Sequence, residues 1–357
     1  MVLLFILQEK NNLQLLHLDA IMLKMQKKIM IFALLACGML CLSSCSRQKK
    51  QNITPAKPDL VVFTPHPADK TEAIIREFRQ RTGLTVQEIH GGTAELLSML
   101  KGGAVADVFW GGGVESLEAA KELFMPYVSS ESYAINPLYV DSEHRWTGFS
   151  VMTMIIVYNS VLVTDKNIPC SWTDLKAPFY SKRVFIPNPE KSGSAYSMLN
   201  TILLTSGGEN WELLGAIKSQ AGSSGVAENA PSVHTSVASG EYFAGLTSED
   251  SALSYLQEHP ESPLSIVYPS DGTVAVADGV ALIKGAAHTQ PAEVFIDFVL
   301  SDTVQSYIVQ NWMRVSVRND VAIPEKACEP SEINILPYDI YEAARNRDLF
   351  LEKWREL

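Results

Sequence analysis

Strand-like and helix-like segments alternate through the first part of this sequence. Apolar strand segments lie at 60–64, 84–89 and 106–110, and an amphipathic helical pattern follows each, the third expected over 114–123. This alternation predicts an α/β fold built on a mostly parallel sheet flanked by helices. In such sheets a ligand lies beyond the carboxyl ends of the strands. We therefore expect the loops that follow these strands, at 64–66, 90–93 and 110–113, to meet at one site.

The third of these loops carries the most informative stretch, Asp-Val-Phe-Trp-Gly-Gly-Gly at 107–113. Glycine has no Cβ, so a ligand can approach bare backbone N–H groups closely there. We predict ligand contacts from Gly111 and Gly112, with the Trp110 indole stacked on the ligand. A simple turn is the alternative for the glycines, and core packing is the alternative for Trp110.

The chain changes character at 146–162, where a long apolar, β-branched run predicts a strand that crosses into a second lobe. The segment 274–283 predicts the return crossing, and two crossings imply a hinge. We expect lobe 1 to comprise 59–150 with about 270–325, and lobe 2 to comprise 151–269 with about 326–357.

Ser192, Gly193 and Ser194 precede a helix predicted over 195–204. Hydroxyl groups, free backbone N–H groups and the positive end of the helix dipole together suit an anionic group. N-capping alone is the alternative explanation for these residues.

The charge balance limits the classes of partner. The chain has 29 Lys and Arg against 40 Asp and Glu, and no basic run extends beyond Lys49 and Lys50. A nucleic-acid or anionic-membrane surface is therefore not expected, and small molecules or proteins are the expected partners.

The N-terminal region has the pattern of an export signal. Lys27 and Lys28 precede an apolar run at 29–40, which is too short for a comfortable membrane span. Residues 1–44 are therefore predicted to be a signal peptide. Residues 1–24 precede the usual start of such a signal, so translation is expected to begin at Met25 or Met22.

Leu-Ser-Ser-Cys at 42–45 resembles the bacterial lipobox, which implies cleavage before Cys45 and lipidation of its thiol. Residues 45–58 then form a tether, and the protein is anchored at the extracytoplasmic side of a bacterial membrane. An ordinary secretory peptide is the alternative. Cys170 and Cys328 remain in an oxidising compartment, where their spacing does not establish a disulfide.

Two short matches to enzyme motifs carry little weight. His90-Gly91-Gly92 is similar to an esterase oxyanion loop, and Ser98 with Lys101 fits Ser-x-x-Lys. Both lack the surrounding elements that such enzymes need, and Ser98 and Lys101 fall within an amphipathic helix. We predict a protein that is not an enzyme and needs no cofactor.

Several segments together resemble the ABC-transporter solute-binding proteins of the ferric-ion-type branch, which are class II periplasmic binding proteins. The resemblance spans roughly residues 58 to 325, and it lies in 61–67, 90–97, 107–113, 245–250, 268–275 and 295–301. It implies a two-lobed fold with a ligand cleft at the hinge. It also implies a monomer that works with an ABC permease and ATPase.

The resemblance separates two kinds of ligand. Ferric-binding members use adjacent tyrosines, a histidine and a carboxylate, the hard ligands that suit ferric iron. At the tyrosine positions this chain has 248–251, Ser-Glu-Asp-Ser, and Gly111 and Gly112 stand where the carboxylate would be. His66 alone matches the first-loop histidine, so no metal site is expected.

The glycine-rich form instead resembles the subgroup that binds phosphorylated sugars and related organophosphates. In that subgroup two carboxylates hold sugar hydroxyls, and Asp250 and Asp271 match their positions, with Asp271 in place of a glutamate. Helix N-termini at Thr93 and at 192–194 would take the phosphate.

We therefore predict a substrate-binding lipoprotein of an ABC importer that captures a small anionic organophosphate by closure of its lobes. A ferric-ion receptor and an extracellular sensor for a histidine kinase remain the alternatives. The residues expected to contact the ligand are Thr64, His66, Gly92, Thr93, Trp110, Gly111, Gly112, Ser192, Gly193, Ser194, Asp250 and Asp271.

Overall fold

A computed structural model describes residues 57–205, 209–227 and 232–357, and the residues from 58 to 357 form one compact unit. The predicted signal peptide, Cys45 and nearly all of the predicted tether lie outside the described residues. Among the helices of the described part, none is long and apolar enough to cross a membrane.

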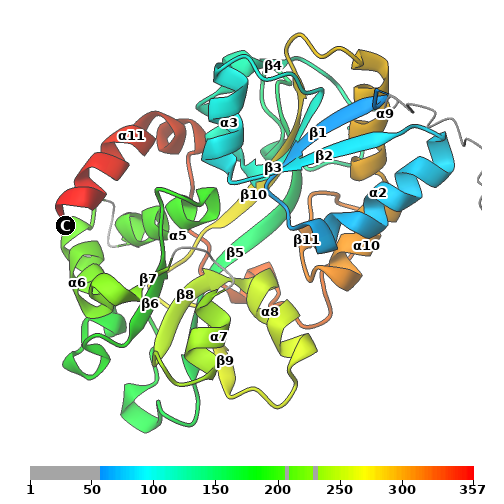
Figure 1. Ribbon diagram of the computed structural model, residues 1–357. Helices are drawn as coiled ribbons and strands as arrows, with labels where there is room; N and C mark the ends of the chain where they lie inside the picture. The colour runs from blue at the N-terminus through cyan, green and yellow to red at the C-terminus, as the bar shows by residue number, and fades with distance from the viewer. Residues whose placement is uncertain (1–56, 206–208, 228–231) are drawn as a thin grey trace, which may run out of the picture. The chain divides into compact units, whose positions relative to one another are not determined.

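The strands of the described residues join in one curled sheet in the order β2-β1-β3-β10-β5-β8-β6-β7 (Figure 1). Three short strands pair at its sides: β4 with β10, and β9 and β11 with β5. The bounds are β1 Leu60–Thr64, β2 Val86–His90, β3 Val108–Gly113, β4 Phe124–Met125, β5 Thr147–Asn159, β6 Val184–Pro187, β7 Val226–Ala227, β8 Ala244–Ser248, β9 Leu264–Val267, β10 Ala275–Ile283 and β11 Val315–Ser316.

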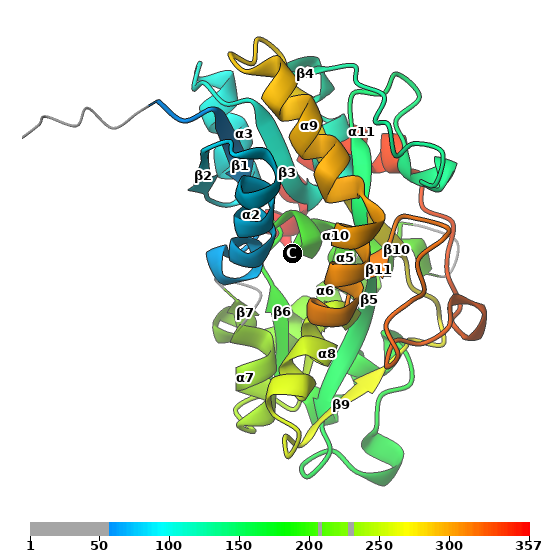
Figure 2. The same ribbon diagram turned by 90° about the vertical axis from the view of Figure 1, so that its right-hand side faces the viewer.

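Helices pack on both faces of this sheet (Figure 2). Their bounds are α2 Ala68–Thr82, α3 Thr93–Lys101, α4 Val114–Glu118, α5 Gly193–Leu204, α6 Trp211–Ala221, α7 Ser232–Ala238, α8 Glu249–Glu258, α9 Thr289–Leu300, α10 Asp302–Asn311 and α11 Ile340–Glu356. The predicted α/β architecture is confirmed.

Alternation along β3 divides the core between the two faces of the sheet. Val108 and Trp110 pack with α2, α9 and α10, in a cluster that includes Phe78 and Phe295. Phe109 points to the opposite face and packs with α3 and α4. Both faces of this strand are therefore buried, as its unbroken apolar sequence requires.

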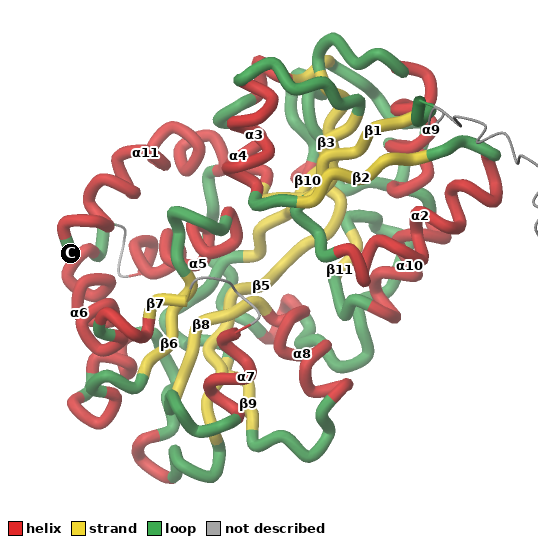
Figure 3. The backbone as a smooth tube through the Cα atoms, viewed as in Figure 1, coloured by secondary structure: helices red, strands yellow, loops and turns green. Residues whose placement is uncertain are grey.

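The sheet is mixed rather than mostly parallel. β1 pairs in parallel with β2 and β3, and β6 pairs in parallel with β7 and β8. β5 and β10 run antiparallel between these two groups (Figure 3). Each pairs antiparallel with its neighbours on both sides, so these two strands join the two parallel groups.

β5 is the long strand predicted at 146–162. Its first half, Thr147–Thr153, pairs with β10, and its second half, Met154–Tyr158, pairs with β8. One strand therefore contributes to both groups of strands, which is the arrangement expected of a crossing segment. The lobe boundaries drawn from the sequence remain a prediction.

Some predicted element limits are wrong. Gly111–Gly113 are not a turn after β3 but its last three residues, and Gly113 pairs with Asp278 of β10. The helix predicted over 114–123 ends at Glu118, because the chain turns there into a short 3₁₀ helix at Lys121–Leu123.

Cys170 and Cys328 are both free thiols.

Candidate ligand-binding site

A cavity of about 800 Å³ opens between the two groups of strands, beyond the ends of β1 and β3. Both groups contribute to its walls, which include residues within 65–70, 92–93, 112–113, 191–194, 246–251 and 312–314. The three loops predicted to meet do so, with His66, Gly92 and Gly112 in one lining.

Four helices begin at this cavity, and the residues at their starts line it. They are α2 after Pro67, α3 after Gly92, α5 after Ser192 and α8 after Ser248. The N-cap side chains of α2, α3 and α8 accept no hydrogen bond, although Glu95 Oε2 accepts from the Gly92 N–H at the start of α3. At the start of α5 the Ser192 hydroxyl accepts a hydrogen bond from the Ala195 N–H at 3.3 Å. The positive ends of four helix dipoles therefore lie around one space, an arrangement that favours an anion.

Arg314 bridges carboxylates from two elements at the side of this cavity. Its Nε lies 2.9 Å from Asp250 Oδ2 at the start of α8, and its Nη1 lies 2.5 Å from Asp278 Oδ2 in β10. Nη1 also donates to the Ser150 hydroxyl at 3.0 Å. Burial acts to lower the pKa of Arg314, but Asp278 and Asp250 outweigh it and raise that pKa.

Only one of the two carboxylate oxygens of Asp250 has a hydrogen-bond partner among the described residues. Its side chain is buried, Oδ2 accepts from Arg314, and Oδ1 has no hydrogen-bond partner among the described residues. Buried polar atoms are nearly always paired in native proteins. We therefore expect a ligand or a water molecule to donate a hydrogen bond to Oδ1.

The His66 ring packs among three aromatic side chains beside the cavity. Its ring centroid is 5.2 Å from those of Trp110 and Trp312 and 5.7 Å from that of Phe149. Its Nε2 is buried, lies 3.4 Å from Asp278 Oδ2 and has no hydrogen-bond partner among the described residues.

Burial, followed by the positive charge of Arg314 and by His90, lowers the pKa of His66 well below its ordinary value. The imidazole is therefore neutral at pH 7, so it adds no positive charge to the cavity. The positive charge that acts on it most strongly is that of Arg314.

Gly111 and Gly112 are required by packing. Gly111 has φ +115°, and a Cβ there would lie 2.8 Å from His66 Nε2. Gly112 has φ +78°, and its Cβ would lie 2.8 Å from the Thr93 Cγ2. Both glycines therefore allow a neighbouring side chain to come close to the strand. Gly112 also lines the cavity, whereas Gly111 does not.

Most of the predicted contact residues come together at this cavity. Its lining includes His66, Gly92, Thr93, Gly112, Ser192, Gly193, Ser194 and Asp250. Thr64, Trp110, Gly111 and Asp271 do not line it.

Thr64 and Trp110 lie beneath the cavity, in the sheet. Both are fully buried, and the Thr64 hydroxyl donates to the Trp110 carbonyl at 2.7 Å. The Thr64 hydroxyl also accepts from the His66 N–H at 3.1 Å. Because β3 continues to Gly113, Trp110 sits within the strand, and core packing rather than stacking on a ligand describes its position.

Asp271 is used elsewhere in the fold. One of its carboxylate oxygens accepts from the Trp172 N–H at 3.0 Å, and the other accepts from the Thr173 N–H and hydroxyl, both at 3.1 Å. These bonds hold the start of the 3₁₀ helix Thr173–Lys176. The Asp271 carboxylate therefore accepts hydrogen bonds from the backbone of a neighbouring loop.

Sequence reasoning missed Arg314, Asp278 and Trp312, which all line the cavity. Asp278 did give a signal, since it is a lone carboxylate within the apolar strand β10, and buried charges are rarely unpaired. Arg314 and Trp312 follow α10, far along the chain from the other lining residues, and no local pattern marks them. In the described residues, no group of three or more His, Cys, Asp or Glu is arranged to hold a metal.

The sequence profile of the bacterial extracellular solute-binding proteins matches residues 105–343. This chain belongs to that family. The predicted family is thus confirmed: the chain is a bacterial extracellular solute-binding protein, and its family is one of binding proteins.

Relatives in this family have different ligands in their names. Iron uptake protein A1 of Synechocystis is 28% identical over 77% of this chain and 81% of its own length. A putative 2-aminoethylphosphonate-binding periplasmic protein of Salmonella typhi is 21% identical over 68% of this chain and 73% of its own length.

The fold has close counterparts among solved structures. The periplasmic binding protein AfuA from Actinobacillus pleuropneumoniae, solved with fructose-6-phosphate bound, superimposes with a TM-score of 0.75. The two chains are 21% identical, and the match covers 83% of this chain and 97% of AfuA. At this identity the likeness concerns the two-lobed fold alone.

Proposed function

We propose that this protein is the substrate-binding lipoprotein of an ABC importer and that it captures a small organophosphate, such as a phosphorylated sugar, in the cavity between its two groups of strands. The observation that carries the proposal is the meeting of four helix N-termini at that cavity. Backbone N–H groups at helix starts are well suited to phosphate oxygens.

The phosphate is held by the starts of α3 and α5, at Gly92, Thr93 and Ser192–Ser194. Gly193 and Thr93 lie close together there, since a Cβ on Gly193 would be 3.6 Å from Thr93 Oγ1. The two helices therefore contribute donors to the same small region. Hydroxyl groups of Ser194 and Thr93 add further donors to the backbone.

The hydroxyl-bearing part of the ligand is held by Asp250. Its Oδ1 has no donor among the described residues, and a carboxylate accepts readily from a sugar hydroxyl. Arg314 fixes the orientation of the carboxylate through Oδ2. One side of the ligand thus meets donors, and the other meets an acceptor.

Ferric iron fits this lining less well. Hard oxygen-rich ligands are needed, and the lining offers no tyrosine pair at 248–251. Asp250 and Asp278 both pair with Arg314, so these two carboxylates of the lining already hold a guanidinium between them. A trivalent cation would have to displace that arginine.

Binding is coupled to closure, because a ligand held by both groups of strands favours the form in which both sets of contacts are made. The permease and ATPase then receive the ligand from that form. The protein acts as a monomer held outside the cytoplasm by a lipid on Cys45. Replacing Cys45 with serine is expected to release the protein from the membrane fraction of expressing bacteria. Retention of the Cys45→Ser chain in that fraction would rule out this anchor.

Calorimetry with fructose 6-phosphate, fructose, inorganic phosphate, 2-aminoethylphosphonate and ferric citrate tests the ligand class. We expect binding of the phosphorylated sugar, weaker binding of inorganic phosphate, and none of fructose. Asp250→Asn keeps an oxygen for Arg314 but replaces the second acceptor with an amide N–H group. We expect it to weaken sugar-phosphate binding by about 1.5–3 kcal/mol, roughly ten- to a hundredfold.

Asp271→Asn is the matched control, because it makes the same chemical change at a carboxylate outside the cavity. Its affinity should equal that of the wild type. Binding of ferric citrate with no response to any phosphate compound would contradict the proposal. Equal affinities in Asp250→Asn and wild type would remove Asp250 from the site.

A further inference from the structure

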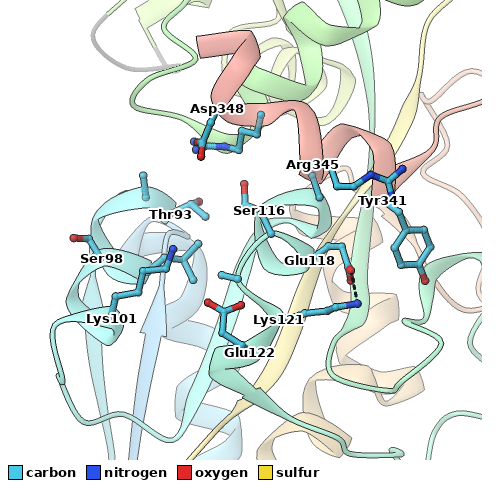
Figure 4. Close-up of a pocket in the computed structure, with 16 residues that line it drawn as sticks. Thr93, Ser98, Lys101, Ser116, Glu118, Lys121, Glu122, Tyr341, Arg345 and Asp348 are labelled. Carbon is cyan, nitrogen blue, oxygen red and sulfur yellow. Dashed lines mark ion pairs between the residues drawn. The ribbon is translucent and has the colours of Figure 1, made fainter. Parts of the chain in front are cut away.

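A second cavity, of about 780 Å³, lies between α3, the segment 116–122 and the C-terminal helix α11 (Figure 4). Of the described residues that line the two cavities, Thr93 is the one they share. The second cavity is therefore a separate space. Its lining includes neither Asp250 nor the residues of α5 that are proposed to bind phosphate.

Thr93 and Ser116 form the wall between the two cavities. A Cβ on Gly193 would lie 3.4 Å from Ser116 Oγ and 3.6 Å from Thr93 Oγ1. The first turn of α5 thus packs against these two hydroxyl groups on the side of the ligand-binding cavity. Ser116 lines the second cavity on the other side of this contact.

Two polar groups at this cavity lack partners. Ser116 is only 4% exposed, and its hydroxyl makes no hydrogen bond to a described residue. The Arg347 Nε is also buried and has no acceptor in the described part of the chain. The Arg347 guanidinium lies 5.8 Å from the centroid of the Tyr196 ring, a contact that uses none of its N–H donors.

Unpaired buried donors are rare in native proteins, and their usual explanation is a ligand or an ordered water. Arg347 is a permanent cation with N–H groups in a planar fork, which matches a phosphate or carboxylate group. A serine hydroxyl beside it completes a donor set for the same kind of group.

The charges around this space favour an anion at its buried end. Lys121 pairs with Glu118 at 2.8 Å, and the other Glu118 oxygen accepts from Trp146 Nε1 at 3.0 Å, so this carboxylate is fully used. Lys101 and Arg347 form no ion pair within 4 Å with any described residue, although the charge of Arg347 acts on the buried Glu115 and lowers the pKa of that carboxyl against the rise from burial. Figure 4 shows the Lys101 side chain reaching toward the space beside Ser116.

Carboxylates also face this cavity. Glu122 and Asp348 line it, and both also lack an ion pair within the described residues. They lie among Lys101 and Arg345, so the outer part of the lining has mixed charge. A ligand with one acidic group directed inward and polar groups directed outward fits this distribution.

We propose that this second cavity binds a small anion that carries a phosphate or carboxylate group, and that Ser116 and Arg347 donate hydrogen bonds to the acidic group while Lys101 supplies charge at its side. The site is independent of the ligand bound between the groups of strands, and it does not depend on the function proposed above. Because Thr93 and Ser116 separate the two spaces, both sites can be occupied at once.

Equilibrium dialysis with radiolabelled inorganic phosphate tests this site in the full-length chain. Ala119 is exposed and lines the cavity, so Ala119→Trp fills the space without disturbing the core. We expect the Ala119→Trp chain to bind about one equivalent of phosphate less than the wild type at saturation. Ala287→Trp is the matched control, since Ala287 is exposed and lines neither cavity, and it should bind the wild-type amount.

Arg347→Gln provides a second measure that leaves the cavity open. It should raise the dissociation constant of this phosphate about tenfold, equivalent to about 1.4 kcal/mol, with no change at the other site. Equal phosphate uptake by wild type and Ala119→Trp would overturn the proposal. An unchanged phosphate isotherm for Arg347→Gln would do so as well, even if the tryptophan variant failed to fold.

Discussion

Replacing Glu115 with glutamine is expected to abolish a fall in stability that the wild-type protein shows as the pH rises. Glu115 lies in α4 and is fully buried. One of its carboxylate oxygens accepts a hydrogen bond from the Ser197 hydroxyl of α5, and the other has no partner among the described residues. Burial raises the pKa of Glu115 to about 7, although the bond from Ser197 acts in the opposite direction.

The size of the effect follows from this shift. The unfolded chain gives Glu115 its ordinary pKa of 4.5, whereas the folded chain raises that pKa to about 7. The folded state therefore binds the proton more tightly, so the contribution of Glu115 is greatest below pH 4.5 and is lost as the pH rises through about 7. The difference corresponds to a loss of about 3 kcal/mol in the free energy of unfolding.

Urea unfolding at a series of pH values measures this loss. Glutamine resembles the protonated acid in shape and charge and can still accept from Ser197, so Glu115→Gln should match the wild type near pH 4.5. Near pH 8 it should be more stable than the wild type by up to about 3 kcal/mol. Comparison of the two chains cancels the titration of all other groups.

Glu356→Gln is the control, because Glu356 is exposed and its substitution changes the charge by the same amount. Its stability should follow the wild-type curve at each pH. If the curves of Glu115→Gln and wild type run parallel from low to high pH, Glu115 is charged in the folded protein and the argument from burial is wrong.

Two further substitutions test the packing of the ligand-binding cavity. Arg314→Ala leaves two buried carboxylates without their cation and should lower the free energy of unfolding by about 3–5 kcal/mol in urea titrations; a loss below 1 kcal/mol would show that water replaces the guanidinium. Gly111→Ala forces a Cβ to within 2.8 Å of His66 Nε2 at φ +115° and should destabilise the fold by about 1–3 kcal/mol. A wild-type melting temperature for Gly111→Ala would mean that His66 moves aside at little cost.

The sequence was sufficient for the elements whose formation depends on local pattern. The apolar run of β5, the strands at β1 and β3 and the helix starts at Gly92 and Ser192 could all be placed within a few residues. Their loops then met at one cavity because parallel strands end at a common edge. These features follow from periodicity and from glycine and serine at helix starts, which are local signals.

The predicted contact residues that lie outside the cavity are positioned by tertiary contacts. Trp110 could be assigned to a ligand only if β3 ended before the glycines, and pairing of Gly113 with Asp278 extends the strand beyond them. Asp271 matches a family position, but its carboxylate binds the backbone at Trp172 and Thr173. Pairing register and side-chain orientation are set by neighbours distant in the chain, so no local pattern reveals them.

The glycines at 111 and 112 explain how this chain differs from its iron-binding relatives at the level of packing. A carboxylate that followed the Asp-Val-Phe strand would need a Cβ in space that His66 Nε2 and the Thr93 side chain occupy, each at 2.8 Å. The difference at 111 and 112 therefore involves the packing of the neighbouring side chains as well as the loss of a carboxylate. In this chain His66 and Thr93 occupy that space, burial keeps His66 neutral, and Arg314 pairs with both Asp250 and Asp278. A metal site could return only if this packing were rebuilt, whereas an anion fits the helix starts as they stand.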